Sequence, residues 1–287
     1  AANPRLIYTS LKPFSNGAPW QDYPANRSVV NALGGATYLC GHIGGDPVEP
    51  GVDLPDVISG VFGALGICAA LYQRELTGEG QSIEISQQAS LVALSRSAYE
   101  FYSTNRRNNR PGNAFPTMPD MVPMDMYPAK GEDQWVILGC QGEGMFAKLC
   151  EAMGQPELQS DPRFIDPKKR SRYKMELNRI IENWTVKHDK YELMEMLLQE
   201  RRIVCSAVRS IDDIVNDEEA RTLGPLQKVV DEECGEMWIP AMPCNADGIN
   251  TKVEPPITGD AANSLVFASL LGLSEEQINR LSGNKVI

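Results

Sequence analysis

The sequence predicts an α/β fold. Roughly its first third alternates strand-like runs with longer helical stretches, in the order strand, helix, strand, helix. The 287 residues, 42% of them hydrophobic, suffice for one large domain or two ordinary ones, each with its own core. Past residue 140 the composition shifts toward amphipathic helices, which indicates a second domain.

The first strand is expected at 6–11, where an apolar run ends at Lys12 and Pro13. Next we expect a short helix closed by two glycines, then a loop rich in glycine and proline, and after the central helix a strand ("QSIEIS") and a long helix. These elements lie at 26–35, 36–55, 81–86 and about 87–104.

The central helix is predicted within "DLPDVISGVFGALGICAALYQRELTGEG" (53–80), beginning near Asp56 and ending at Gly78. The chain carries no charge between 57 and 71, so we expect this helix to be buried nearly all round. Glycines inside a helix cost about 1 kcal/mol each relative to alanine. Their three-residue spacing clears one stripe of the helix for a neighbouring backbone or a ligand: Gly60, Gly63 and Gly66.

Asp56 follows Pro55, a good helix-boundary residue, and stands where a side-chain oxygen could cap the first amides of the helix. The same position would keep a carboxylate ionised at the positive end of the helix dipole, facing a gap lined by glycine. Asp56 is therefore a capping residue, a nucleophile, or both.

The stretch 105–128 lacks any hydrophobic period and is expected to be a long loop. Its methionines could form an adaptable apolar wall for an acyl group, or fill a gap in the core: Met118, Met121, Met124 and Met126. Three arginines near its start are either a solvated helix end or a source of local positive charge: Arg106, Arg107 and Arg110.

The remaining elements place a smaller domain at 128–250, with 1–127 and 251–287 forming the large one. We expect strands at 131–140, 203–210 and, as a pair, 226–245. Helices are expected at 143–153, 171–185, 189–201, 261–270 and 274–281, with a short one at "SIDDIVND".

Charge and composition exclude several classes of function. A net charge of −11 argues against a general binder of nucleic acid or anionic membranes, because the overall field repels phosphate. The apolar stretch 57–72 is too short for a membrane span of about 18 residues. Neither His42 nor His188 has metal-ligand spacing, so no metal is expected. Seven scattered cysteines without a C-x-x-C pair indicate a reducing, cytoplasmic location.

Several segments in this order resemble the family III CoA-transferases over almost the entire chain. They are "NPRLIYTSLKPF", "PGVDLPDVISG", "AALYQRELTGEGQSIEIS", "RPGN", "DPRF", "IVCSAV" and "LGLSEEQINRL". In that family an aspartate lies 21 residues before the threonine of a TG-G turn, with a glycine four places after it. Asp56, Thr77 and Gly60 fit this spacing, whereas Asp53 does not.

The resemblance implies that CoA moves between an acyl-CoA thioester and a free carboxylic acid, both bound as substrates, with no tightly bound cofactor. Asp56 would attack the thioester, form a mixed anhydride and then carry CoA as an aspartyl thioester. Gly60 would leave room beside it. The family's CoA-contacting loop corresponds to Lys12, Pro13, Phe14 and Ser15, with Lys12 meeting a phosphate-bearing part of CoA. Lys12 is otherwise a surface lysine at the end of a strand.

The resemblance also implies a Rossmann-like large domain, which here lacks the family's usual N-terminal segment. Family dimers are interlocked, so we expect either a homo-oligomer of this kind or a second chain that supplies the missing segment. Two alternatives remain: a non-catalytic or partner-dependent subunit, and an acyl-CoA racemase or isomerase. The racemase branch uses a histidine where this sequence has Asn26, which disfavours racemisation because asparagine cannot accept the α-proton.

Overall fold

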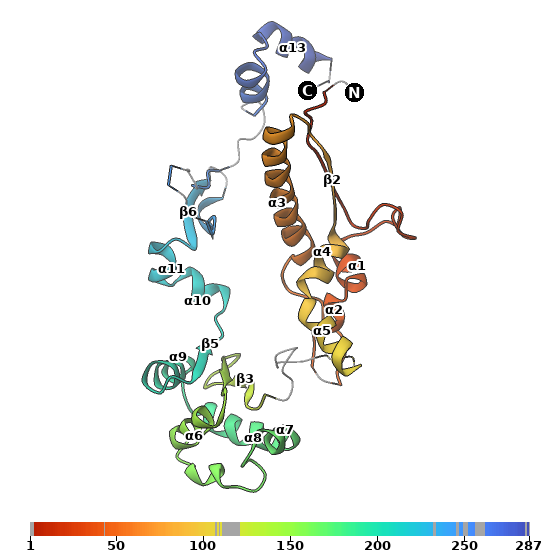
Figure 1. Cartoon of the computed structure of the whole chain (residues 1–287). Helices are drawn as coiled ribbons and strands as arrows, with labels where there is room; N and C mark the ends of the chain where they lie inside the picture. The colour runs from red at the N-terminus through yellow and green to blue at the C-terminus, as the bar shows by residue number, and fades with distance from the viewer. Residues whose placement is uncertain are drawn as a thin grey trace. The chain divides into compact units, whose positions relative to one another are not determined.

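The computed structural model describes residues 3–42, 44–106, 108, 110, 121–231, 234–244, 247–248, 252–255, 262–284 and 286 (Figure 1). The chain forms two compact units, Ala1–Val208 and Arg209–Ile287, each treated by itself below. The fold is mixed α/β, as the sequence predicted. The Rossmann-like arrangement and the domains 1–127 with 251–287 and 128–250 remain predictions.

The N-terminal part of the first unit is built on two parallel strands, β1 (Tyr8–Lys12) and β2 (Ser82–Ser86), paired so that Lys12 lies opposite Ser86. Helix α3 (Leu54–Thr77) connects them and packs against both. Because α3 runs antiparallel to the strands, from their carboxyl ends to their amino ends, its N-terminus lies at the carboxyl edge of the sheet (Figure 1).

The glycines of α3 let the helix approach the sheet closely. A Cβ on Gly63 would lie 3.2 Å from Cδ1 of Leu11, and one on Gly66 would lie 3.2 Å from Cγ2 of Ile83. These two contacts confirm the predicted close approach for part of the stripe.

Two expectations for α3 were wrong. The helix begins at Leu54 with Asp53 as N-cap, so Asp56 is not the cap but lies in the first turn. Proline tolerates the first turn because its missing N–H would be unpaired there, which allows Pro55 to lie inside the helix.

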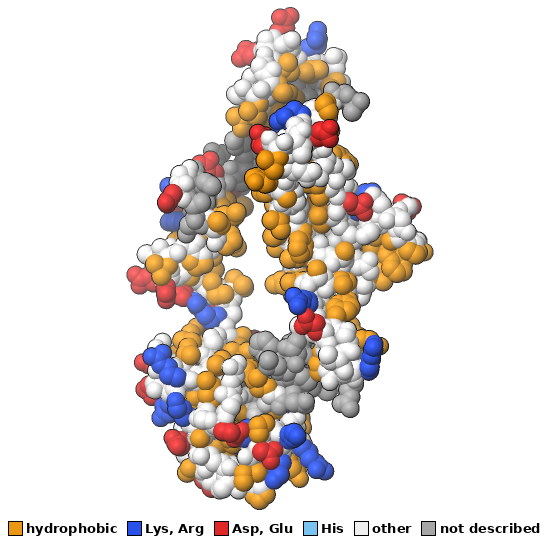
Figure 2. Space-filling model, in the orientation of Figure 1, with side chains coloured by type: hydrophobic (Ala, Val, Ile, Leu, Met, Phe, Trp, Pro, Cys, Tyr) orange, Lys and Arg blue, Asp and Glu red, His pale blue; other side chains and the backbone are white. Residues whose placement is uncertain are grey.

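The helix is also not buried all round. Its buried residues are Pro55, Ser59, Gly63 and Ala70. Large apolar side chains on the rest of its surface are exposed: Val57, Val61, Leu65, Tyr72 and Leu76. Figure 2 shows hydrophobic side chains gathered over α3. The reason is geometric, since the two strands and the neighbouring helices cover only part of the surface of α3. With 24 residues and a window of mean hydropathy 1.8, α3 is also longer than expected, and its length and composition alone would allow a membrane span.

Four helices complete this part of the unit, and α1 and α4 among them contact α3: α1 (Arg27–Leu33), α2 (Ala36–Leu39), α4 (Gln87–Leu94) and α5 (Arg96–Asn105). The single helix expected at 87–104 is therefore interrupted at Ser95, and α2 lies in a segment expected to be a loop. A small core of Val30, Ala36 and Leu91 joins α1, α2 and α4. Leu54 and Ile58 of α3 pack against it.

The rest of the first unit has its own core around an antiparallel sheet in the order β3 (Met124–Pro128), β4 (Trp135–Gly139), β5 (Val204–Ala207). The sequence predicted β4 and β5, but placed β3 in an irregular loop. Helices pack beside this sheet: α6 (Glu143–Ala152), η1 (Pro156–Gln159), α7 (Pro167–Arg172), α8 (Lys174–Thr185), α9 (Lys190–Met194) and η2 (Glu195–Glu200).

Arg170 ties this core together, with 3% of its side chain exposed. Its guanidinium donates to the carbonyl oxygens of Val122 (3.1 Å) and Phe164 (2.8 Å) and to both carboxylate oxygens of Glu143, and it lies 4.3 Å from the ring centroid of Phe146. Hydrogen bonding to Arg170 lowers the pKa of Glu143.

The second unit contains the predicted strand pair, β6 (Leu226–Asp231) and β7 (Gly235–Pro240), joined in antiparallel register. Two short helices precede it, α10 (Ile211–Val215) and α11 (Glu218–Thr222). The two predicted closing helices are present as η3 (Ser264–Leu270) and α13 (Glu275–Gly283).

Candidate active site

Asp56 lies at the carboxyl edge of the parallel strands, in the first turn of α3. Ligand sites of open α/β sheets form at this edge, because loops and helix N-termini converge there. Its carboxylate is exposed and no ion pair to it is formed among the described residues. The amino end of a 24-residue helix favours the negative charge.

The side chain that contacts Asp56 comes from the next helix. Gln87, the first residue of α4, donates its Nε2 amide to Oδ1 of Asp56. The position of Gln87 is fixed in turn because Ser86 caps α4 and the amide of Gln88 donates to the carbonyl of Pro13 at 3.1 Å. Helix α4, which begins directly after β2, thus orients the Asp56 carboxylate through Gln87.

Gly60 lies one turn after Asp56, and a Cβ built on it would meet no heavy atom within 4 Å. Unlike Gly63 and Gly66, it therefore makes no close contact within the chain. Its exposed backbone leaves open space next to the carboxylate, and the approach of a ligand there remains a prediction.

Lys12 ends β1 at the same edge and is exposed. Its Nζ donates to Oδ1 of Asn16 at 2.7 Å, and Asn16 in turn donates through its backbone and side-chain nitrogens to the carboxylate of Glu84 on β2. An ammonium group has three donors, so this one hydrogen bond leaves capacity for a phosphate oxygen.

The other residues of the predicted CoA loop differ in exposure. Pro13 and Ser15 are half-buried, whereas the Phe14 side chain is completely buried and packs edge-on against Trp20, with 6.3 Å between ring centroids. Phe14 therefore anchors the loop, and only its backbone can face a ligand.

The other residues singled out in the sequence are arginines and methionines of the stretch 105–128. Arg107 and Met118 lie outside the described residues, and so does most of "RPGN". Of the remaining methionines, Met124 is 5% exposed and packs in the sheet, which favours the core-filling alternative for that residue. Arg110 donates through Nε to the carbonyl of Tyr38 at 3.0 Å and stacks on its ring, so it supports α2 instead of remaining solvated.

Sequence reasoning missed Gln87, Asn16 and Glu84 as parts of the site. Gln87 is 31 positions from Asp56, and Glu84 is 68 positions from Asn16, so no local spacing connects them. The one available signal was the parallel pairing of two short strands, each followed by polar residues at its carboxyl end.

Comparison with known proteins identifies the family of this chain. The model described as CoA-transferase family III matches residues 1–260. The succinyl-CoA–D-citramalate CoA-transferase of Chloroflexus aurantiacus is 28% identical over 100% of this chain and 71% of its own length. The alpha subunit of succinyl-CoA–L-malate CoA-transferase from the same species is 31% identical over 100% of this chain and 67% of its own. The formyl-CoA:oxalate CoA-transferase of Streptomyces avermitilis is 29% identical over 99% and 72%.

Solved structures agree on the fold. A CAIB/BAIF family protein from Brucella suis superposes with a TM-score of 0.80 at 22% identity, covering 93% of this chain and 68% of that one. Rv3272 from Mycobacterium tuberculosis gives 0.74 at 21% identity, covering 92% and 69%. The chain therefore belongs to the family III CoA-transferases, enzymes that transfer CoA between an acyl-CoA and an acid.

Proposed function

We propose that this protein is an acyl-CoA:carboxylate CoA-transferase in which Asp56 is the covalent nucleophile. The observation that carries the proposal is an exposed carboxylate in the first turn of α3, contacted by the Gln87 amide and flanked by the open space at Gly60. Membership of the family supplies the reaction, and the geometry supports this residue as its centre.

The proposed reaction balances without an oxidant or a metal. A carboxylate oxygen of Asp56 attacks the thioester carbonyl of the donor, the C–S bond breaks, and a mixed anhydride and CoA thiolate result. The thiolate then attacks the aspartyl carbonyl, releasing the donor acid as its carboxylate and leaving an aspartyl-CoA thioester. The acceptor carboxylate repeats these two steps in reverse, which yields its CoA ester and free Asp56.

The local structure suits both roles of this carboxylate. The helix N-terminus stabilises the ionised form that attacks, and Gln87 holds one oxygen so that the other faces the open side. Once the aspartyl carbonyl becomes tetrahedral, the same Gln87 amide can donate to the oxyanion. Gln87 thus acts in attack by positioning and in the later steps by charge stabilisation.

Lys12 is the proposed contact for a CoA phosphate. Its place at the carboxyl edge, beside the Pro13–Ser15 loop, gives a local cation in a chain whose net charge is −11. The hydrogen bond to Asn16 and the nearby carboxylate of Glu84 hold the side chain at this edge. Phosphate would bind as a further partner of the same ammonium group.

The acids exchanged are a separate matter. The relatives are named for citramalate, malate and oxalate, with succinyl-CoA or formyl-CoA as donor. Some relatives are also named as alpha and beta subunits, so a second chain is a proposal alongside a homo-oligomer.

Activity of paired variants tests the proposal. The chain is assayed with succinyl-CoA plus L-malate or D-citramalate and with formyl-CoA plus oxalate, alone and with added candidate partner chains. Asp56→Asn should remove any transfer detected, because an amide is too weak a nucleophile. Asp53→Asn is the matched control, three residues away and without a side-chain cap hydrogen bond, and should keep it. Full activity of Asp56→Asn would refute the assignment.

A further inference from the structure

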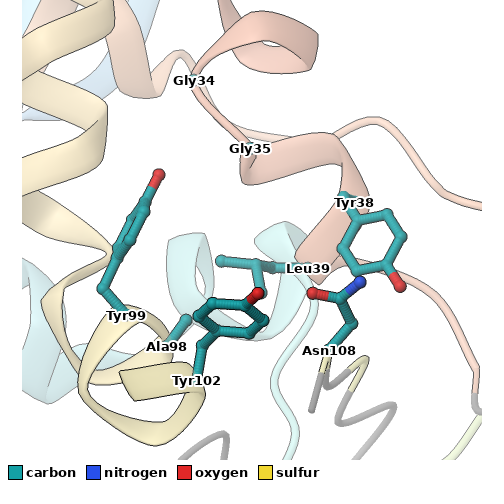
Figure 3. Close-up of a pocket in the computed structure, with 8 residues that line it drawn as sticks. All are labelled: Gly34, Gly35, Tyr38, Leu39, Ala98, Tyr99, Tyr102 and Asn108. Atoms are coloured by element: carbon teal, nitrogen blue, oxygen red, sulfur yellow. The ribbon is translucent and has the colours of Figure 1, made fainter. Parts of the chain in front are cut away.

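A cavity that Asp56 does not line lies between helices α2 and α5 and has a volume of about 340 Å³. Three tyrosine rings and two glycines surround it, together with Leu39, Ala98 and Asn108. Figure 3 shows Tyr99 and Tyr102 projecting from α5 toward the α2 side, where Tyr38 and Asn108 stand side by side. This tyrosine pocket, defined by Tyr38, Tyr99 and Tyr102, is at the lower end of the size range of small-molecule sites.

The backbone on the α2 side makes room for the pocket. Gly35 has φ 86°, a left-handed conformation that favours glycine, and a Cβ on it would already lie 3.8 Å from the Tyr99 hydroxyl. Gly34 is pressed against Leu91, where a Cβ would come within 2.9 Å. A side chain at either position would strain or fill this wall.

Every polar side chain that lines the pocket can donate a hydrogen bond to an acceptor ligand. No carboxylate occurs among its described lining residues, and the three phenol hydroxyls form no hydrogen bond with other described residues. The Asn108 amide adds two further donors. Arg110 stacks its guanidinium 4.8 Å from the Tyr38 ring centroid, which brings a positive charge to this side of the pocket.

The apolar walls of the pocket favour a particular kind of ligand. Its walls are mainly aromatic, and tyrosine rings pack against another aromatic ring in offset or edge-on contact, which stabilises the pair beyond the burial of apolar area alone. The pocket is also close to the candidate active site, because Gly34 contacts Leu91 one helical turn after Gln87.

We propose that the tyrosine pocket binds a small aromatic carboxylic acid, with its ring between Tyr99 and Tyr102 and its carboxylate on the side of Tyr38, Asn108 and Arg110. The proposal goes beyond the CoA-transfer reaction and does not depend on the role of Asp56. A whole CoA molecule exceeds the cavity volume of about 340 Å³, so the proposed occupant is a small acid and not an entire CoA ester.

Calorimetric titration of the full chain with 3-phenylpropanoate tests the proposal, and 3-phenylpropanol serves as a matched probe without the carboxylate. We expect saturable binding of the acid and at least fivefold weaker binding of the alcohol. Tyr99→Leu and Tyr102→Leu should each weaken the acid at least fivefold. Both side chains are nearly half exposed, at 47% and 46%, so these variants should fold, as circular dichroism can verify.

Two control variants separate this proposal from the previous one. Tyr23→Leu removes a tyrosine that is 64% exposed and outside the pocket, and should leave binding unchanged. Asp56→Asn should also bind the acid normally, whatever its effect on CoA transfer. Absence of saturable binding, equal binding of acid and alcohol, or unchanged binding by folded Tyr99→Leu and Tyr102→Leu would each overturn the inference.

Discussion

Replacing Gly60 with alanine should raise stability and lower substrate affinity at the same time. Gly60 lies in the second turn of α3, its backbone is exposed, and an added Cβ meets no heavy atom of the chain within 4 Å. Alanine in a helix interior is favoured over glycine by about 0.5–1 kcal/mol, so the free energy of unfolding should rise by that amount.

The loss of substrate affinity should appear only when acyl-CoA binds. If the space at Gly60 belongs to the substrate, a methyl group placed there overpacks the complex by about 1–3 kcal/mol, which raises the apparent KM for the acyl-CoA roughly 5- to 150-fold. Urea unfolding measures the first effect, and initial rates over a range of acyl-CoA concentrations measure the second.

Gly63→Ala is the matched control on the same helix. Its Cβ would lie 3.2 Å from Leu11, so part of the helix-propensity gain should be lost to crowding, with little change in KM. A Gly60→Ala variant that is destabilised would show that the helix surface is occupied. One that is stabilised with an unchanged KM would show that the substrate lies elsewhere.

Three further predictions concern the core, the thiols and the positioning of the carboxylate. Arg170→Leu should lower the free energy of unfolding by about 2–5 kcal/mol, since it leaves the buried carbonyls of Val122 and Phe164 unpaired, whereas the exposed Glu143 carboxylate returns to water; Arg172→Leu on the exposed side should change it by about 0.5 kcal/mol or less, and equal effects in urea melts would contradict the buried network. Burial raises the pKa of Cys140 to about 12, so this thiol should resist alkylation by iodoacetamide at pH 8 while exposed Cys68 reacts, and stability should fall as pH rises from about 9 toward 12, because unfolded thiols ionise first; fast labelling of Cys140 in mass spectra would refute its burial. Gln87→Ala should lower kcat about 2- to 10-fold through loss of one exposed hydrogen bond to a carboxylate, with KM unchanged in steady-state assays, whereas an unaltered kcat would remove Gln87 from the mechanism.

The sequence was most informative where chemistry and spacing coincide. The separation of Asp56 and Thr77 along the sequence, with Gly60 between them, singled out a carboxylate that the structure places in the first turn of α3. The start of the helix was misplaced because Pro55 was interpreted as a boundary. Proline is also tolerated within a first turn, and that use prevailed here.

Burial of α3 could not be predicted from hydrophobicity alone. An uncharged stretch shows that a helix surface is apolar, but not which side a neighbour covers. Here the sheet and α4 contact one stripe, and Val61 and Leu65 remain 59% and 62% exposed. Glycine spacing was the better guide, because Gly63 and Gly66 mark the side that meets the strands.

Strand β3 was missed for a different reason. Asp125 interrupts the apolar pattern at a buried position, and a charged residue there argues against a core strand. The structure compensates for this charge with Lys174, whose Nζ lies 2.9 Å from Oδ2 of Asp125, and with an Asn178 amide at 3.1 Å. Such long-range pairing of a buried charge cannot be seen from local sequence.

Covalent trapping tests directly whether Asp56 is the nucleophile. The chain is incubated with succinyl-CoA or formyl-CoA, quenched with hydroxylamine, and digested for peptide mass spectrometry. We expect a hydroxamate on Asp56 that forms only when acyl-CoA was present and is missing from Asp56→Asn. Modification of another carboxylate instead, with turnover intact and Asp56 untouched, would contradict it.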